Sequence, residues 1–399
     1  MSSLLRPMMA RDPNESGRTA SVLELFFDLV FVIAVGRAAG ELHHGIAHGH
    51  AAHALGVYAL MFFGIWWAWM NFTWFATSFD VDDWLYRVLT FVQMLGVLVF
   101  AAGMASFGEG NLRIILLGYV IMRVALVSQW WRASRNATGE VKAATQVYVV
   151  GTAVVQCGWA LLAFAAPEQM VVPLYVLLLL AELVVPMLAE SKGSTPWHPH
   201  HIAERYGLFT IILLGESLLA SANAIFNLVE DGEHPSALIG LALVAFVMAA
   251  MLFWVYFYPP HHSNITQSAR TSALYSYGHY FIFAAAGALA AGMEVQLDLL
   301  DHAAHVDHVV ANAAITGPVA TFLVVTWLVA MRRHVPRLVS GATLAGAVVI
   351  VAATFLPYAM LITAVTLVAV VVVIIRCPLT NAHGHGAAAE APATAPAAE

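Results

Sequence analysis

Charged residues are scarce in this chain: Asp, Glu, Lys and Arg make up 10% of its 399 residues, whereas hydrophobic residues make up 61%. Soluble domains usually carry about 25% charged residues. So little charge cannot cover a water-soluble surface, which excludes an ordinary soluble fold. The composition predicts an all-α, polytopic membrane protein whose partners are the lipid bilayer and a small solute or ion, with a homo-oligomer left open.

Several functional classes also lack their usual motifs. The two cysteines, Cys157 and Cys377, lie in different hydrophobic segments, so no disulfide framework is indicated. No Gly-rich phosphate loop with Lys and Ser/Thr is present, which argues against an ATP-driven pump. No basic patch with interleaved aromatic residues suggests a nucleic-acid partner. We find no specific catalytic motif, and we therefore expect neither an enzyme nor a cofactor.

Long hydrophobic runs dominate the rest of the chain. Its polar start shows no short apolar run with a cleavage site, so we expect the first hydrophobic segment to remain as a helix. We count about twelve runs near the ~20 residues that cross a bilayer. They lie at 21–41, 54–76, 84–106, 111–131, 144–166, 170–189, 203–227, 236–258, 271–293, 309–331, 338–355 and 357–376. Because Pro357 separates the last two, 338–376 can also be one broken helix.

The basic residues indicate an orientation. With an even number of spans and the N-terminus inside, all but three of the 17 Lys and Arg residues fall on the inner side. The exceptions, Arg37, Arg113 and Arg123, lie within predicted helices. This positive-inside pattern predicts that both termini are cytoplasmic.

Short matches suggest an internal repeat. Phe100-Ala-Ala-Gly103-Met104 in the third run resembles Leu289-Ala-Ala-Gly292-Met293 in the ninth. Six spans per half would preserve orientation, so we predict two parallel six-helix repeats, an arrangement common in transporters. The predicted organisation is a cytoplasmic arm (1–20), a first half (21–189), a cytoplasmic linker (190–202), a second half (203–376) and a disordered cytoplasmic tail (377–399).

Two acids stand inside the first run. Glu24 and Asp28 are four residues apart, which places both on one face of a helix. Like charges at this spacing repel, so we expect a cation, a metal ion or a proton nearby. The alternative is structural: Glu24 caps the helix and Asp28 pairs with one buried Arg.

Other ionisable residues lie deep in the predicted spans, where such groups are costly and often functional. They are Arg123, Glu182, Glu216 and His279. Together with Asp28, the two glutamates could form a proton relay or cation site with Arg123 as counter-charge. The alternative is that Arg123 pairs with Asp28 or Glu182 and fixes helix packing.

A second cluster opens the seventh run. His200 and His201 lie four and three residues before Glu204, spacings that could share a metal ion. His201, Glu204 and Arg205 could instead form an inner gate, or the segment could be a capped helix start with a Glu204–Arg205 ion pair. Two outer loops are rich in His and could bind metal or be merely biased in composition. One holds His43, His44, His48, His50 and His53, and the other holds His302, His305 and His308. The aromatic-rich ends of runs two and eight are typical of an interfacial belt and packing.

Two long motifs resemble one protein family. Leu23-Glu24-Leu25-Phe26-Phe27-Asp28-Leu29-Val30-Phe31 resembles the opening signature of the bacterial low-temperature-requirement A (LtrA) family. His200-His201-Ile202-Ala203-Glu204-Arg205-Tyr206-Gly207-Leu208-Phe209-Thr210-Ile211-Ile212-Leu213-Leu214-Gly215-Glu216-Ser217 resembles its second signature. The resemblance implies a multi-pass protein of the bacterial inner membrane over about residues 18–376. It implies no particular substrate or reaction.

These patterns favour a secondary transporter coupled to protons or cations. A cation channel is the first alternative, with Phe26, Phe27 and Phe31 forming a constriction beside Asp28. Phe27-Asp28 is also similar to the Phe-Ser-Asp motif of a lysosomal and bacterial potassium-channel family, although Ser is missing here. A membrane-embedded, metal-dependent enzyme or sensor is the second alternative.

Overall fold

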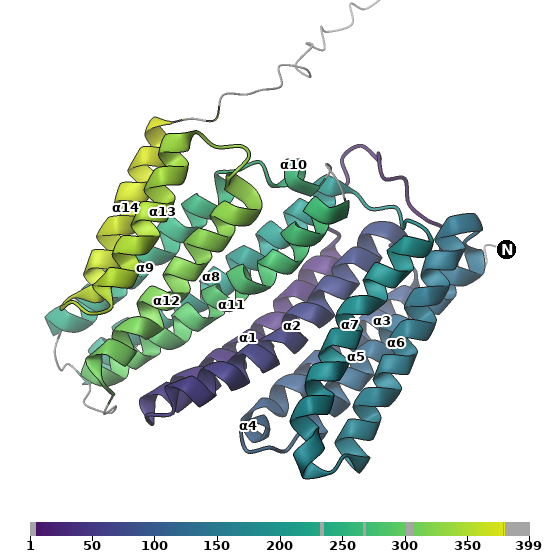
Figure 1. Ribbon diagram of the computed structural model, residues 1–399, viewed down its shortest axis with the longest axis horizontal. Coiled ribbons are helices and arrows are strands. Elements are labelled where there is room, and N and C mark those ends of the chain that lie inside the picture. Colours follow the sequence, from purple (N-terminus) through teal and green to yellow (C-terminus); the bar gives the residue numbers. More distant parts are fainter. Residues whose placement is uncertain (1–4, 232–234, 266–268, 301–305, 378, 380–399) are drawn as a thin grey trace, which may run out of the picture.

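The computed structural model describes residues 5–231, 235–265, 269–300, 306–377 and 379. Within these residues the secondary structure is entirely helical, with twelve helices of 17 residues or more (Figure 1). The first six are α1 (Val22–Ala47), α2 (Ala51–Phe79), α3 (Trp84–Ala102), α5 (Arg113–Asn136), α6 (Gly139–Ala165) and α7 (Val171–Lys192). The other six are α8 (Pro199–Asp231), α9 (Pro235–Phe257), α11 (Ala269–Leu300), α12 (His308–Thr326), α13 (Arg337–Ala353) and α14 (Ala359–Arg376).

Short elements interrupt or join the long helices. They are α4 (Met104–Phe107), a 3-10 turn η1 (Glu168–Met170), α10 (His261–Ile265) and a π segment η2 (Trp327–Met331). Every predicted hydrophobic run coincides with one long helix. In the part of the chain that the structure describes, nine helices are long and apolar enough to cross a membrane, which makes this an integral membrane protein. Crossing by all twelve remains a prediction, because α1, α8 and the shorter α13 are not among the nine.

The last hydrophobic stretch forms two helices rather than one. After α13 ends at Ala353, the chain turns through Pro357 and Tyr358, whose φ of 59° is left-handed, and α14 returns alongside α13. Pro disfavours a continuous helix through this point. Most of the predicted tail, residues 380–399, lies outside the described residues, as do His302 and His305 of one His-rich loop.

The two predicted halves lie side by side, with α1 and α2 between the remaining helices of each half (Figure 1). Within the first half, α1 packs on α2 and α3, then α3 packs on α5, α5 on α6 and α6 on α7. The second half repeats these neighbours in the same order, from α8 to α14. This shared order supports the predicted repeat, which remains a prediction. The halves meet chiefly where α1 packs on α11 and α8.

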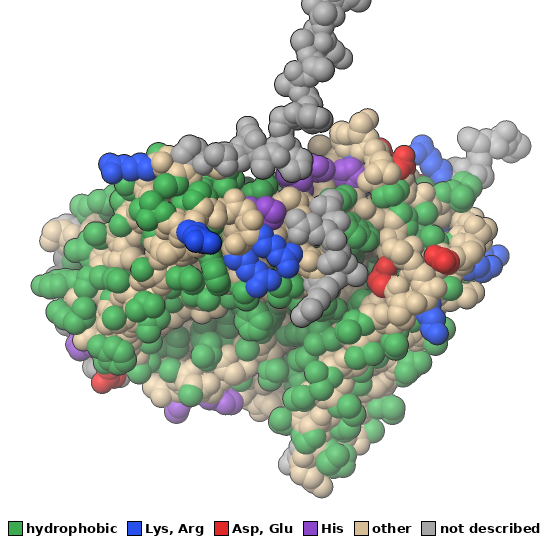
Figure 2. Space-filling model, turned by 45° about the horizontal axis from the view of Figure 1, so that its top comes forward, with side chains coloured by type: hydrophobic (Ala, Val, Ile, Leu, Met, Phe, Trp, Pro, Cys, Tyr) green, Lys and Arg blue, Asp and Glu red, His purple; other side chains and the backbone are tan. Residues whose placement is uncertain are grey.

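One end of the molecule is basic. The helices α1, α3, α6, α8, α11 and α13 begin there, and Lys and Arg side chains gather toward it, whereas hydrophobic side chains cover the flanks (Figure 2). We call this the basic end. The N-terminal segment is packed against it: Met8 is fully buried and the Arg11 amide donates to the Ser78 carbonyl over 2.9 Å.

The tryptophans of α2 differ from the interfacial belt predicted from the sequence. Trp66, Trp67 and Trp69 are 2% exposed or less and lie inside the bundle. Trp69 stacks on Phe209 of α8, with ring centroids 4.5 Å apart. Of the interfacial belt and packing predicted for this end of the run, these three residues show the packing. The indole N–H groups of Trp67 and Trp69 donate hydrogen bonds to the buried acids Glu182 and Asp28.

Candidate functional site

The start of α1 positions the first acid. Ser21 is the N-cap, and its amide donates to Glu24 Oε2 over 2.7 Å, while the Glu24 amide donates to Ser21 Oγ over 3.3 Å. This capping box fixes the Glu24 side chain over the first turn. Asp28 follows one turn later on the same face, and both side chains are fully buried.

Arg205 of α8 supplies the positive charge between the two acids. Its Nη1 donates to Glu24 Oε1 over 2.8 Å, and its Nε and Nη2 donate to Asp28 over 3.1 and 2.5 Å. Trp69 Nε1 donates to the same Asp28 carboxylate over 2.7 Å. The guanidinium group, fully buried, thus joins the first helices of the two halves.

The predicted Glu204–Arg205 pair is not formed. Neighbouring residues on a helix do not face each other, so Arg205 points into the bundle while Glu204 accepts from the Ala20 amide over 3.1 Å. Arg205 belongs to the Glu24–Asp28 site, a role that the sequence interpretation gave to Arg123.

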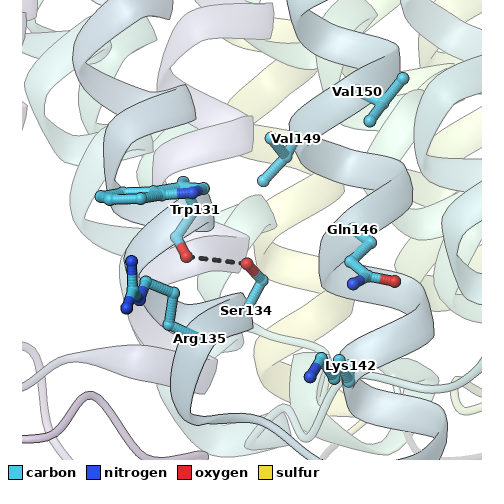
Figure 3. Close-up of a pocket in the computed structure, with 7 residues that line it drawn as sticks. All are labelled: Trp131, Ser134, Arg135, Lys142, Gln146, Val149 and Val150. Atoms are coloured by element: carbon cyan, nitrogen blue, oxygen red, sulfur yellow. Dashed lines mark hydrogen bonds between the residues drawn. The ribbon is translucent and has the colours of Figure 1, made fainter.

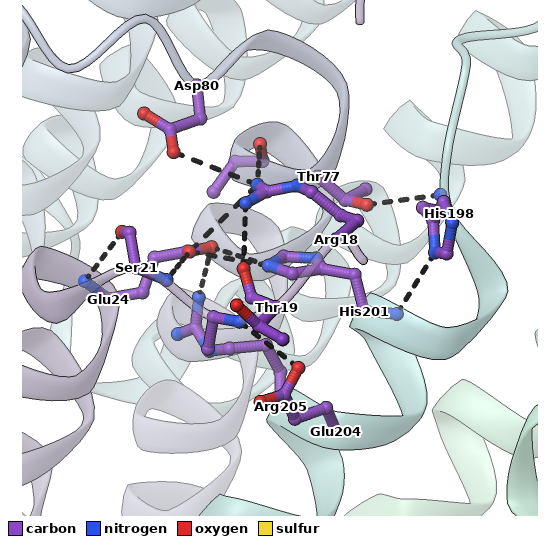
Figure 4. A network of polar contacts seen from close by, with 12 residues as sticks. Arg18, Thr19, Ser21, Glu24, Thr77, Asp80, His198, His201, Glu204 and Arg205 are labelled. Carbon is purple, nitrogen blue, oxygen red and sulfur yellow. Dashed lines mark hydrogen bonds and ion pairs between the residues drawn. The ribbon is translucent and has the colours of Figure 1, made fainter. Parts of the chain in front are cut away.

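His201 completes the buried cluster from one turn before Arg205 (Figure 4). Its Nε2 lies 3.0 Å from Glu24 Oε1, and its Nδ1 has no hydrogen-bond partner in the described part of the chain. A carboxylate only accepts, so Nε2 carries a proton, and Nδ1 has no acceptor beside it that would stabilise a second proton in this buried position. His201 is therefore a neutral donor.

The cluster continues to the basic end through Arg18 and Asp80 (Figure 4). Arg18 Nη2 lies 4.0 Å from Glu24 Oε2 and 3.7 Å from Asp80 Oδ2. Asp80 follows α2, and burial, reinforced by the Glu24 charge, raises the pKa of its carboxyl to about 6. We call Asp80, Arg18, Glu24, His201, Arg205 and Asp28 the inter-half network.

This network lacks one positive charge. Three carboxylates, Asp80, Glu24 and Asp28, face the guanidinium groups of Arg18 and Arg205. Arg11 also lies 3.6 Å from Asp80, but it is shared with Glu15. With His201 neutral, one proton or one monovalent cation balances the remaining charge. Unbalanced charge is costly in a buried site, so such a partner is favoured.

An aromatic layer lies next to the network, on the side away from the basic end. The Phe209 ring is 6.4 Å from that of Phe31 and 5.1 Å from that of Phe283. Trp69 stacks on Phe209 and contacts Phe283 edge to face at 5.6 Å. These four buried rings from α1, α2, α8 and α11 fill the contact between the halves.

His279 supports this layer and does not join the charges. Its Nδ1 lies 2.6 Å from the Tyr275 carbonyl oxygen, and its Nε2 lies 2.9 Å from the Tyr256 hydroxyl. Nδ1 donates to the carbonyl oxygen, and the Tyr256 hydroxyl can donate to Nε2, so a neutral imidazole satisfies both contacts. Its ring also contacts Phe283 at 5.3 Å.

A second acidic group lies beyond the aromatic layer. Glu216 is half-buried, and a Cβ on Gly36 of α1 would lie 3.3 Å from its Oε1. Two turns further along α1, His43 Nε2 lies 2.7 Å from Asp298, and its Nδ1 lies 3.3 Å from Glu294. Glu216 is therefore separated from Asp28 along α1, and the predicted three-acid relay does not form one cluster.

Arg123 and Glu182 form a separate network inside the first half. Glu182 of α7 pairs with Arg123 of α5, and both are 1% exposed. The Glu182 carboxylate also accepts from Trp67, Tyr119, Gln156 and Trp159 at 2.9 to 3.2 Å. We call these six residues the closed network. Of the two partners that the sequence left open for Arg123, the structure places Glu182 beside it.

The three weak metal candidates point to different partners. His201 faces Glu24, Glu204 faces the Ala20 amide, and the His200 ring stacks on His262 at 4.3 Å. Among the described residues, no group of three His, Cys, Asp or Glu side chains could hold a metal ion.

Sequence reasoning missed several members of these networks. Arg18 and Asp80 look like ordinary polar residues outside the hydrophobic runs. The folded N-terminal arm brings Arg18 to Glu24, and the end of α2 places Asp80 beside Arg18. The hydrogen bonds of Trp67 and Trp69 could have been predicted in kind, because a buried indole N–H usually needs an acceptor and other hydrophobic runs contain acids.

Comparison with known proteins gives two findings. A family described as "Bacterial low temperature requirement A protein (LtrA)" matches residues 19–375. The chain is also similar to uncharacterized protein RA0937 of Rhizobium meliloti (strain 1021), with 27% identity over 284 residues and 67% of each chain covered. The family match spans both halves and includes the closed network and all of the inter-half network except Arg18.

Proposed function

The chain belongs to the bacterial low temperature requirement A (LtrA) family and is an integral membrane protein, and on this premise we propose that it is a secondary transporter coupled to protons or cations. We further propose that its basic end and both termini face the cytoplasm of a bacterial inner membrane. Most Lys and Arg residues gather at the basic end, with Arg37 and Arg113 toward the opposite end as exceptions, and this bias supports the orientation.

The observation that carries the proposal is the missing positive charge of the inter-half network. Ionisable groups buried at membrane depth usually mark ion or proton pathways. In this protein they lie where α1 meets α8, between the two halves, which is where repeat-built transporters commonly place their sites. Asp80 at the basic end, with a pKa raised to about 6, is suited to exchange a proton with the aqueous phase.

The network also links charge to helix contact. Arg205 binds Glu24 and Asp28 of α1 simultaneously and therefore holds the two halves together. A proton or cation that neutralises Asp28 removes one of these two attractions. The α1–α8 contact then weakens, and one half can shift relative to the other. We propose that this shift opens the aromatic layer and exposes the site to the side of Glu216.

Glu216 is the acid we assign to the opposite side. It is half-buried beside Gly36, and the charge of Glu294 acts on it, so a cation is attracted there. Glu182 and Arg123 receive a structural role in this proposal, because five donors already satisfy the Glu182 carboxylate.

A cation channel is the second candidate, and the aromatic layer favours it, because hydrophobic constrictions gate some channels. Phe31 takes part in this layer and Phe27 is buried beside Phe72. Phe26, by contrast, is 49% exposed and contacts Phe91 on the outside of the bundle. A channel constriction would thus consist of Phe31, Trp69, Phe209 and Phe283.

The test uses purified protein in liposomes under an imposed pH gradient. Internal pH and membrane potential are recorded while Na⁺, K⁺ and small solutes are added. Wild type is compared with Glu216→Gln and with Glu109→Gln, which removes an exposed acid from a loop on the same side. We expect a proton flux that a solute or cation triggers, lost in Glu216→Gln and kept in Glu109→Gln.

Two other results would contradict the proposal. A flux that follows the membrane potential and needs no second solute would establish the channel instead. Absence of flux in the wild type under all conditions would exclude both candidates and would favour the sensor or enzyme alternative.

A further inference from the structure

A pocket outside both networks lies between α5 and α6 at the basic end (Figure 3). Its volume is about 550 Å³. Trp131, Ser134 and Arg135 reach it from the last turns of α5, and Lys142 and Gln146 reach it from the first turns of α6. The site combines two cations, an amide and an indole ring.

The two cations of this pocket are available to a ligand. Arg135 and Lys142 are exposed, and no carboxylate of the described residues lies within 4.0 Å of either. Arg132, by comparison, is held by Asp83. Arg135 packs over the Trp131 ring at 5.2 Å, which holds its guanidinium group at the pocket edge.

The pocket changes from polar to apolar along α6. Val149 and Val150 follow Gln146 at the upper edge in Figure 3. Val150, Val154 and Leu161 of α6 are 62%, 64% and 66% exposed. Charges at the basic end followed by an exposed apolar stripe match the shape of an amphiphile with an anionic headgroup. A free inorganic anion would use only the polar part.

We propose that this pocket binds the phosphate headgroup of an anionic phospholipid, with an acyl chain lying along the apolar stripe of α6. Arg135 and Lys142 contact the phosphate oxygens and Gln146 donates an amide hydrogen bond. Trp131 lies at the level of the headgroup, where indole rings are favoured. Basic pockets between membrane helices are suited to such headgroups.

The experiment measures lipid binding to the purified full chain in detergent by native mass spectrometry. The probes are phosphatidylglycerol, phosphatidylcholine with the same acyl chains, and inorganic phosphate. We expect wild type to hold one phosphatidylglycerol more tightly than phosphatidylcholine. Arg135→Gln/Lys142→Gln should weaken this binding roughly thirtyfold, because each basic residue near an anionic headgroup contributes about fivefold.

The matched control is Arg332→Gln/Arg337→Gln, which removes two exposed basic residues near the same end in the second half. It should leave phosphatidylglycerol binding unchanged, and Arg135→Lys/Lys142→Arg, which keeps both charges, should hold it within a few-fold. Equal loss in the control would show non-specific charge attraction and overturn the proposal. Binding of inorganic phosphate as tight as that of the lipid, or equal binding of both lipids, would overturn it as well.

Discussion

The inter-half network and the closed network contain the same kinds of residue but differ in charge and in reach. In the closed network one Arg faces one Glu, and four further donors complete the carboxylate. All six of its residues belong to the first half. The inter-half network has three carboxylates for two guanidinium groups, joins α1 to α8 and extends to Asp80 at the basic end.

Under the proposed function, this difference assigns packing to the closed network and movement to the inter-half network. A fully paired and hydrogen-bonded carboxylate gains no stability from binding a proton or from moving, and its contacts fix the helices around it. A buried group that lacks one counter-charge gains from a proton or cation. Its helices are held by attractions that such a partner changes, so binding can be coupled to motion between the halves.

The largest expected effect comes from Arg205→Gln. This change leaves Glu24 and Asp28 buried one turn apart without their shared cation, and removing one partner of a buried ion pair costs about 3–5 kcal/mol. We expect a loss of this size in the free energy of unfolding, measured in mixed detergent micelles. Addition of Asp28→Asn to this variant should restore part of the loss. Independent, additive losses in the double variant would contradict the shared site.

Glu182→Gln tests the closed network, with an expected loss of about 3 kcal/mol, the lower end of the cost of breaking a buried ion pair, because it leaves one buried charge uncompensated where Arg205→Gln leaves two. Gln keeps one acceptor oxygen for the indole and phenol donors but loses the ion pair with Arg123. The same unfolding measurement applies, with Glu190→Gln at the end of α7 as a control, because among the described residues the donors to Glu190 are Tyr148 and Thr195 and no cation pairs with it. A smaller loss for Glu182 than for Glu190 would contradict a packing role.

Asp80→Asn tests whether the inter-half network makes the stability of the protein depend on pH. The folded-state pKa of about 6 lies above the ordinary 3.8, so between these values the folded protein binds more protons than the unfolded chain. The contribution of Asp80 to stability is therefore highest below pH 3.8 and falls as pH rises through 6, by roughly 2–3 kcal/mol. The variant should lack this fall.

The measurement is the difference in unfolding free energy between wild type and Asp80→Asn from pH 4.5 to 7.5. His261, whose pKa burial lowers to about 4, titrates in an overlapping range with the opposite sign, but it is present in both proteins and cancels. A difference that is independent of pH would show that Asp80 titrates normally, and the network would then extend no further than Arg18.

The smallest expected effect on stability comes from Gly36→Ala. The new Cβ would lie 3.3 Å from Glu216 Oε1, so the carboxylate must shift. Alanine in a helix gains about 0.5–1 kcal/mol over glycine, so stability should not fall. Gly40→Ala on the same helix meets no atom within 4 Å and is the matched control. We expect slower proton flux in liposomes only for Gly36→Ala, and equal flux in both variants would argue against Glu216.

The sequence predicted the helices well because span length and hydrophobicity are local properties. It also placed Glu24 and Asp28 on one face and left open a pairing between Asp28 and a buried Arg. It could not say which Arg, because Arg123 and Arg205 both lie in hydrophobic runs and their partners are set by helix rotation. Three features depend on contacts between distant segments and could not be predicted. Arg205 points into the bundle, Phe26 points out of it, and Asp80 lies beside Arg18.

The most direct test compares Asp28→Asn with Glu182→Gln in the same liposome flux assay, with each rate normalised to the amount of folded protein. Both changes remove one buried carboxylate charge from a hydrogen-bonded site and keep the size of the side chain. We predict that Asp28→Asn abolishes the coupled proton or cation flux and that Glu182→Gln retains it. Retained flux in Asp28→Asn together with lost flux in Glu182→Gln would contradict the assignment of transport to the inter-half network.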